Sequence, residues 1–144
     1  MNALIDLLRI GAAPSYTFLL YLFAKENINL NIRSNTVNFL VKYFVRRNVT
    51  DFPSTRDLDS IFINLIDLCE NSDGIINTNL VINYLTNSTR FANNQVFREK
   101  LKGDLYEENA GATRFILCKI EESKKTKEKF TDLIFIRQIL QQFL

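Results

Sequence analysis

The residue types that carry most enzyme chemistry are sparse in this chain, and histidine is absent from all 144 residues. Without an imidazole the chain has no Ser-His-Asp or Cys-His nucleophile, no histidine-ligated zinc and no histidine general base. The two cysteines, Cys69 and Cys118, are far apart in the sequence and each has apolar neighbours. The sequence therefore predicts two small buried hydrophobic residues and not metal ligands.

Acidic pairs are the remaining candidates for acid–base or two-metal chemistry, and they occur at Asp57/Asp59, Glu107/Glu108 and Glu121/Glu122. Neighbouring residues on a helix diverge by about 100°, so Glu121 and Glu122 cannot both face one site. Residues 71–76 lack the bidentate glutamate of a calcium loop, and there is no glycine-rich phosphate loop. We predict no catalytic, cofactor-binding or metal-binding residue, and hence no enzyme and no cofactor.

A double arginine, Arg46-Arg47, is the sharpest polar feature. Two guanidinium groups at a helix end, beside Asn48 and Thr50, could bind phosphate or bridge carboxylates. The alternative is structural: one arginine caps backbone carbonyls while the other forms an ion pair within the domain. The second basic feature is a run between residues 124 and 129, whose candidate nucleic-acid contacts are Lys124, Lys125, Lys127 and Lys129.

The lysine run has no interleaved aromatic residues, so a solvated linker between two helices is its alternative interpretation. The whole chain carries 18 basic and 16 acidic residues, a net charge of +2. That charge is too small to imply a nucleic acid or an anionic membrane as the partner. The most apolar stretch, 16–24, is far shorter than the ~20 residues that span a bilayer. The N-terminus is not of the signal-peptide type, so we expect a cytoplasmic protein with no membrane partner.

Helical periodicity dominates the pattern, and we predict an all-α fold: one domain over residues 1–144, a compact bundle of about seven helices with no significant sheet. The first helix should stop at Gly11, and Ser15 should cap the next. Ser34 or Asn35 should cap a third helix that ends at Arg46 and Arg47. The clearest inward stripe comprises Leu58, Ile61, Phe62, Leu65, Leu68 and Cys69, with Ser54 or Thr55 as its cap.

Several stretches together resemble, in order and rough spacing across about residues 4–123, the helical middle region of GmrSD-type restriction proteins. The passage over 43–50 and 53–62 carries the double arginine, the short turn and the proline-threonine step. Residues 14–22 resemble the apolar helix that precedes it in that family. The stretches 94–101, 104–109 and 114–122 resemble the segment before its nuclease domain.

In that bacterial family a helical region joins a ParB-like nucleotide-dependent domain to an HNH nuclease, and the whole protein cleaves foreign or modified DNA. This chain lacks the Asp-Gly-Gln-Gln-Arg-type signature of the first domain and the histidine of the second. Its residues 124–144 diverge into a C-terminal helix. The resemblance implies a non-catalytic scaffold or interaction module, a truncated relative whose partners are the missing domains.

The resemblance also makes Arg46, Arg47 and Arg114 a candidate phosphate or ion-pair site. The rival interpretation is a small helical nucleic-acid-binding protein that uses Arg46, Arg47 and the lysine run between 124 and 129. The two interpretations share one fold and differ in the partner.

Overall fold

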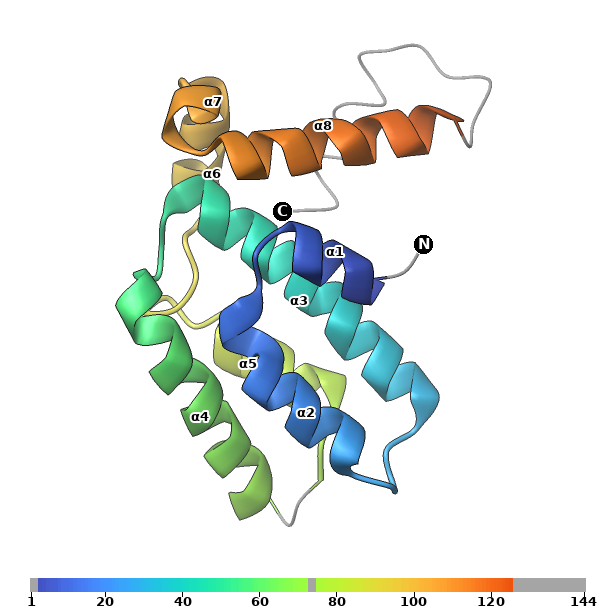
Figure 1. The fold of residues 1–144 in the computed structure, drawn as a ribbon. Coiled ribbons are helices and arrows are strands. Elements are labelled where there is room, and N and C mark those ends of the chain that lie inside the picture. The colour runs from blue at the N-terminus through green and yellow to red at the C-terminus, as the bar shows by residue number, and fades with distance from the viewer. Residues whose placement is uncertain (1–2, 73–74, 126–144) are drawn as a thin grey trace.

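A computed structural model describes residues 3–72 and 75–125 and bears out the all-α prediction: these residues form eight α-helices and one 3-10 turn, with no strand (Figure 1). The predicted last helix over 127–143, and with it Lys127 and Lys129, lies outside the described residues. The elements in chain order are α1 (Ala3–Arg9), the 3-10 turn η1 (Ala13–Ser15), α2 (Tyr16–Ala24), α3 (Leu30–Thr50), α4 (Thr55–Asn71), α5 (Thr78–Leu85), α6 (Asn94–Lys102), α7 (Leu105–Glu108) and α8 (Ala110–Lys125).

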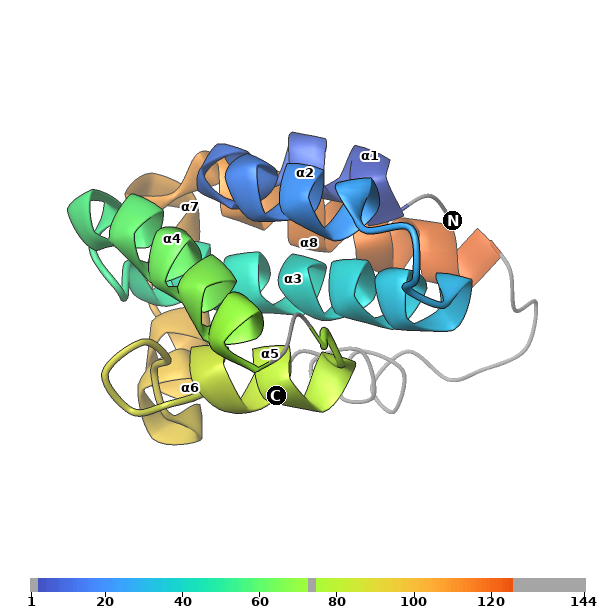
Figure 2. The same ribbon diagram turned by 90° about the horizontal axis from the view of Figure 1, so that it is seen from below.

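The long helix α3 is the centre of the arrangement. It contacts α1, α5, α6 and α8, while α2 packs on α4. Seen from below, α1 and α2 lie on one side of α3, and α5 and α6 lie on the other (Figure 2). Helices α1, α5, α6 and α8 are therefore positioned by their contacts with α3.

The core is built around aromatic rings. Phe44 of α3 stacks on Phe62 of α4 with ring centroids 5.8 Å apart, and Tyr43 meets the same ring edge-on at 6.3 Å. Such pairs contribute about 0.5–1.5 kcal/mol each beyond the area they bury. The predicted stripe of α4 is buried except for Leu68, which is 37% exposed. The prediction was wrong there because the buried face of α4 is narrower than its apolar face.

Helix ends depend on single polar or glycine residues. Helix α1 ends at Arg9, just before the predicted stop at Gly11. Gly11 has φ +75°, and the Gly11 and Ala12 amides donate to the Leu8 and Leu7 carbonyls. This left-handed closure suits glycine, which has no Cβ. Helix α3 starts earlier than predicted, because the Asn29 side chain accepts from the Asn31 amide at 2.8 Å. The predicted caps at Ser34 and Asn35 were therefore wrong.

Two other predicted boundaries also differ. Helix α3 does not end at Arg46 and Arg47 but continues to Thr50, and Asp51 follows with φ +51°. Ser15 precedes α2 as expected, yet its hydroxyl donates to the Ala12 carbonyl at 2.7 Å and caps no amide. Among the helices described here, none combines the length and the apolar character needed to cross a bilayer.

Candidate functional site

The Arg46 side chain is enclosed by the protein, with 1% of the residue exposed. Its Nη1 donates to the Ala92 carbonyl at 2.7 Å, and its Nη2 donates to Asn94 Oδ1 at 2.9 Å. The guanidinium carbon lies 4.4 Å from the ring centroid of Phe91 and 4.6 Å from that of Phe97. Burial lowers the pKa of Arg46. This arginine joins α3 to the start of α6 by hydrogen bonds and cation–π contacts.

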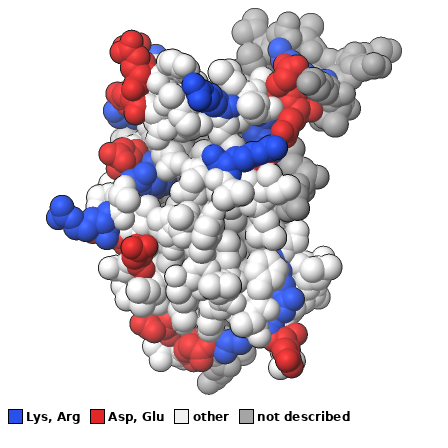
Figure 3. All heavy atoms as spheres, viewed as in Figure 1, with Lys and Arg blue, Asp and Glu red and all other residues white. Residues whose placement is uncertain are grey.

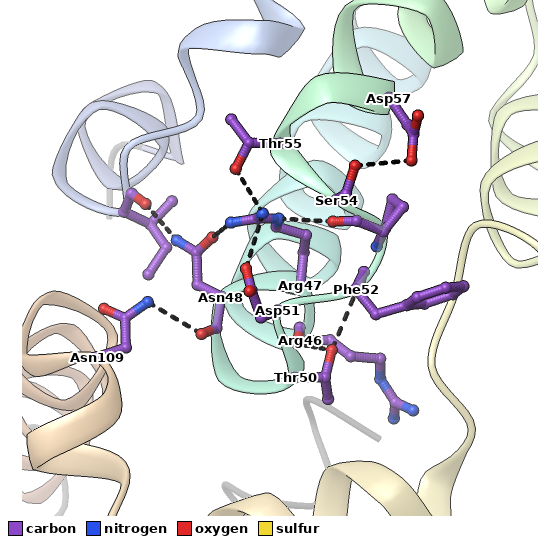
Figure 4. Close-up of polar contacts among 12 residues, drawn as sticks. Arg46, Arg47, Asn48, Thr50, Asp51, Phe52, Ser54, Thr55, Asp57 and Asn109 are labelled. Atoms are coloured by element: carbon purple, nitrogen blue, oxygen red, sulfur yellow. Dashed lines mark hydrogen bonds and ion pairs between the residues drawn. The ribbon is translucent and has the colours of Figure 1, made fainter.

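The Arg47 side chain closes the turn between α3 and α4 (Figure 4). Its Nε donates to the Pro53 carbonyl at 3.0 Å, and its Nη2 donates to Thr55 Oγ1 at 2.8 Å and to Asp51 Oδ1 at 3.0 Å. Its Nη1 reaches Asn48 Oδ1 at 3.2 Å. The Arg47 side chain is 11% exposed, so these groups use nearly all of its planar fork of donors.

Asn48 extends the same set of contacts to two further segments. The Asn48 Nδ2 donates to the Ile10 carbonyl after α1 at 2.7 Å, and the backbone carbonyl of Asn48 accepts from Asn109 Nδ2 at 3.0 Å. Asn109 also accepts from the Ala112 amide and so caps α8. We call Arg46, Arg47, Asn48 and Asn109 the polar joint. Consecutive positions on a helix point about 100° apart, which is why three neighbouring residues of α3 reach three different parts of the chain.

A buried ion pair lies between α1 and α8. Lys119 Nζ is 2.6 Å from Asp6 Oδ1, and these side chains are 9% and 5% exposed. Lys119 also contacts Glu122 at 2.9 Å, and Arg9 of α1 reaches Glu122 at 3.4 Å. Burial alone would lower the pKa of Lys119, but its hydrogen bonds to Asp6 and Glu122 outweigh burial and raise it. The hydrogen bond from Lys119 lowers the pKa of Glu122.

Reasoning from the sequence missed this pair, although a signal was present. Asp6 lies on the same helical face as Ala3 and Ile10, three and four residues away, and Ile10 is buried. Lys119 continues the buried face of Ala112, Phe115 and Ile116 on α8. A charge in register with an apolar stripe indicates a buried ion pair, because an unpaired buried charge costs several kcal/mol, on the order of 3–5.

The structure does not gather the three candidate arginines into one place. Arg114 is exposed on α8, where it lines a hollow of about 500 Å³ with Arg9 and Cys118. Arg46, by contrast, lies between the rings of Phe91 and Phe97. Arg114 therefore does not form one site with Arg46 and Arg47, contrary to the prediction.

The lysine run begins on a helix. Lys124 is exposed near the end of α8, which continues to Lys125, so the expected linker does not begin at Lys124. On the face shown in Figure 3, the basic side chains of the described residues are interspersed with acidic ones and form no continuous basic patch. The described side chains on that face therefore do not form the cationic stripe of a nucleic-acid groove.

The cysteine prediction was half right. Cys69 is buried, and burial raises the pKa of its thiol to about 11. Cys118 is exposed, because the buried face of α8 passes through Phe115 and Lys119 instead. Asp57 accepts from the Ser54 hydroxyl at 2.8 Å, while Ser54 caps no amide with its side chain, contrary to expectation. No group of three or more cysteines and carboxylates suited to a metal ion occurs within 3–72 and 75–125.

Comparison with known proteins adds no family to this geometry. No protein-family model, no curated protein and no solved structure matches the chain.

Proposed function

We propose that this chain is a helical scaffold and interaction module without catalytic activity, which holds the partners bound to it in fixed relative positions. The observation that carries the proposal is the buried ion pair between Asp6 of α1 and Lys119 of α8, 2.6 Å long. It fixes the first described helix to the last one. Fixed geometry between distant parts of a chain is the property that a scaffold needs.

The ion pair supports one arrangement over others for an electrostatic reason. If α1 or α8 shifted, one buried charge would lose its partner, and such a loss costs about 3–5 kcal/mol. At the end of α3 the polar joint adds a second set of restraints through Arg47 and Asn48. The ion pair joins α1 to α8, and Asn48 bonds the residue after α1 and the residue before α8; both of these helices also pack on α3.

The resemblance to the interdomain region of GmrSD-type restriction proteins supplies the partners in this proposal. They would be the nuclease and the nucleotide-binding domain of such a system. The cations at the end of α3 would then serve the fold and not a phosphate, because Arg46 and Arg47 are occupied by carbonyl, amide, hydroxyl and carboxylate oxygens of the chain itself.

Electron paramagnetic resonance tests the fixed geometry. Spin labels are attached to Leu8→Cys on α1 and to the native exposed Cys118 on α8, since Cys69 is buried. We expect one narrow distance distribution, which Asp6→Asn broadens. The exposed Asp59→Asn serves as the matched control and should leave the distribution unchanged. A broad distribution in the otherwise unaltered chain would contradict a scaffold.

The nucleic-acid alternative is tested by filter binding of duplex DNA at two salt concentrations. The scaffold proposal expects weak binding with little salt dependence. A steep salt dependence that disappears when Lys124, Lys125, Lys127 and Lys129 are all changed to Gln would overturn it in favour of a phosphate-binding protein.

A further inference from the structure

The residues that line a hollow of about 650 Å³ beside α5 include four asparagines, together with Tyr84, Arg90 and the two leucines Leu68 and Leu80. The asparagines are Asn77, Asn79, Asn83 and Asn87. We infer that this hollow binds an extended, uncharged polypeptide segment of a partner by pairing asparagine amides with its backbone. The inference rests on the proposed interaction function and names the kind of partner that it would take.

The spacing of the asparagines fits a polypeptide backbone. Asn79 and Asn83 are four residues apart on α5, which places them about 6 Å apart along the helix axis. Asn87 comes another four residues later, just beyond Thr86, whose amide still donates to the Ile82 carbonyl in helical fashion. An extended chain repeats every two residues, or about 6.5 Å. Successive asparagines can therefore meet every second residue of a strand that runs along the helix.

The hydrogen-bonding groups of the hollow are available for such pairing. The side chains of Asn79 and Asn83 are exposed and make no hydrogen bond to any described residue, so each side-chain amide offers both a donor and an acceptor. Asn77 Oδ1 accepts from the Leu80 amide, and Asn87 Oδ1 accepts from the Thr89 amide. These bonds orient the two outer side chains and leave their NH₂ groups to donate to carbonyls of the partner.

The charge of the hollow favours a polypeptide over a nucleic acid. Arg90 is the ionic side chain among its named lining residues, and its guanidinium carbon lies 4.0 Å from the ring centroid of Tyr84. Arg90 Nη1 also donates to the Tyr84 carbonyl at 3.1 Å. One face of the ring is thus covered by the cation, whereas single-strand binders use open aromatic faces and free cations. Neutral amides match a backbone of the same chemistry.

Peptide selection on the full-length chain tests the inference. A random octapeptide phage library is selected against the immobilised protein, and the enriched peptides are then measured as synthetic peptides. We expect Asn79→Ala with Asn83→Ala to weaken their binding at least tenfold. Asn35→Ala with Asn38→Ala, two exposed asparagines on α3, should leave the affinity unchanged. Alanine favours helix, so the variants should keep the fold, which circular dichroism checks.

A second readout separates backbone pairing from ordinary side-chain contact. N-methylation of alternate peptide amides should abolish binding in one register and leave it intact in the other. Failure to enrich any peptide beyond the Asn79→Ala, Asn83→Ala variant would overturn the inference. So would tight binding of a single-stranded twelve-nucleotide DNA that the same variant loses. Neither outcome affects the spin-label distances, so failure of this inference is distinguishable from failure of the scaffold.

Discussion

Arg46 and Arg47 are adjacent in the sequence, yet their guanidinium groups hold different parts of the protein. Arg46 reaches the Ala92 carbonyl at 2.7 Å, and Arg47 reaches the Pro53 carbonyl at 3.0 Å. One residue fixes α3 against the segment before α6, and the other fixes the turn into α4. The two adjacent arginines therefore stabilise two different tertiary contacts of α3.

Replacing Arg46 should be among the most damaging changes to the described part of the chain. Arg46→Met keeps much of the apolar volume but leaves the Ala92 carbonyl and the Asn94 amide oxygen without their donors. We expect the free energy of unfolding to fall by about 3 kcal/mol. Arg46→Lys should restore little, because an ammonium group lacks the planar fork. Urea denaturation measures both, with exposed Arg56→Met as the control. If Arg46→Met lost no more stability than Arg56→Met, the hydrogen bonds of Arg46 would not stabilise the fold as expected.

Substitutions at Asp51 should reveal how much stability its left-handed backbone conformation costs. Asp51 has φ +51° and forms an exposed ion pair with Arg47 at 3.0 Å. Asp51→Ala loses the pair and keeps the strain, so we expect about 1–2 kcal/mol of destabilisation. Asp51→Gly loses the same pair but relieves the backbone, and should lie within about 0.5 kcal/mol of the unaltered protein. Thermal unfolding of the two variants compares them directly; equal losses would remove the backbone explanation.

The buried pair of Asp6 and Lys119 should behave non-additively. Asp6→Ala leaves the buried Lys119 ammonium group with Glu122 as its remaining carboxylate partner among the described residues, and we expect a loss of about 3 kcal/mol. Lys119→Met should cost a similar amount because it removes the cation that pairs with the buried Asp6 carboxylate. The double variant should cost less than the sum of the two, since both buried charges are gone. A double-mutant cycle by chemical denaturation gives the coupling, and simple additivity would show that the two groups act independently.

Acid should remove the contribution of Glu122. The hydrogen bond from Lys119 holds the Glu122 pKa below its usual value of about 4.3. Its stabilisation is therefore complete above that value and is lost as the pH falls through the folded-state pKa. Its side chain is 40% exposed, so we expect Glu122→Gln to cost less than about 1 kcal/mol at pH 7. Unfolding of both proteins should differ at pH 7 and converge in strong acid.

The dependence of stability on pH in the alkaline range should reflect Lys119. Its pKa is raised by its two carboxylate partners despite burial. Its contribution is fully present below the usual lysine value of about 10.4 and is lost as the pH rises through the higher folded-state pKa. The stability difference between the unaltered chain and Lys119→Met should thus shrink only at strongly alkaline pH. A difference that shrank already near neutral pH would contradict this assignment.

The two thiols should react very differently. Cys118 is exposed, and Cys69 is buried with a thiol pKa of about 11. Thiolate is the reactive form, so Ellman's reagent should titrate one thiol in the native protein at pH 8 and two in denaturant. Cys118→Ser should remove the native signal. Rapid reaction of two thiols without denaturant would show that the core around Cys69 opens readily.

The all-α class and much of the core followed from the sequence, because helical periodicity depends on local spacing. The stripe of Leu58, Ile61, Phe62 and Leu65 specifies which face of α4 is buried whatever lies opposite. The prediction of a helix stop at Gly11 was equally local, because glycine has no Cβ and adopts the left-handed conformation whatever its neighbours are. The residues that cap helices were harder to predict. Asn29 and Ser34 each have a side-chain oxygen that can accept from a helix amide, and the choice between them depends on where the chain turns.

Only the tertiary structure decided what the charged residues do. Whether Arg46 binds a phosphate or the chain itself depends on Ala92 and Asn94, which lie far along the sequence. The pairing of Asp6 with Lys119 likewise required α1 and α8 to meet. Hydrophobic burial is set by periodicity along one helix, whereas a hydrogen bond needs a particular partner at about 3 Å. That partner is specified by the way distant helices pack.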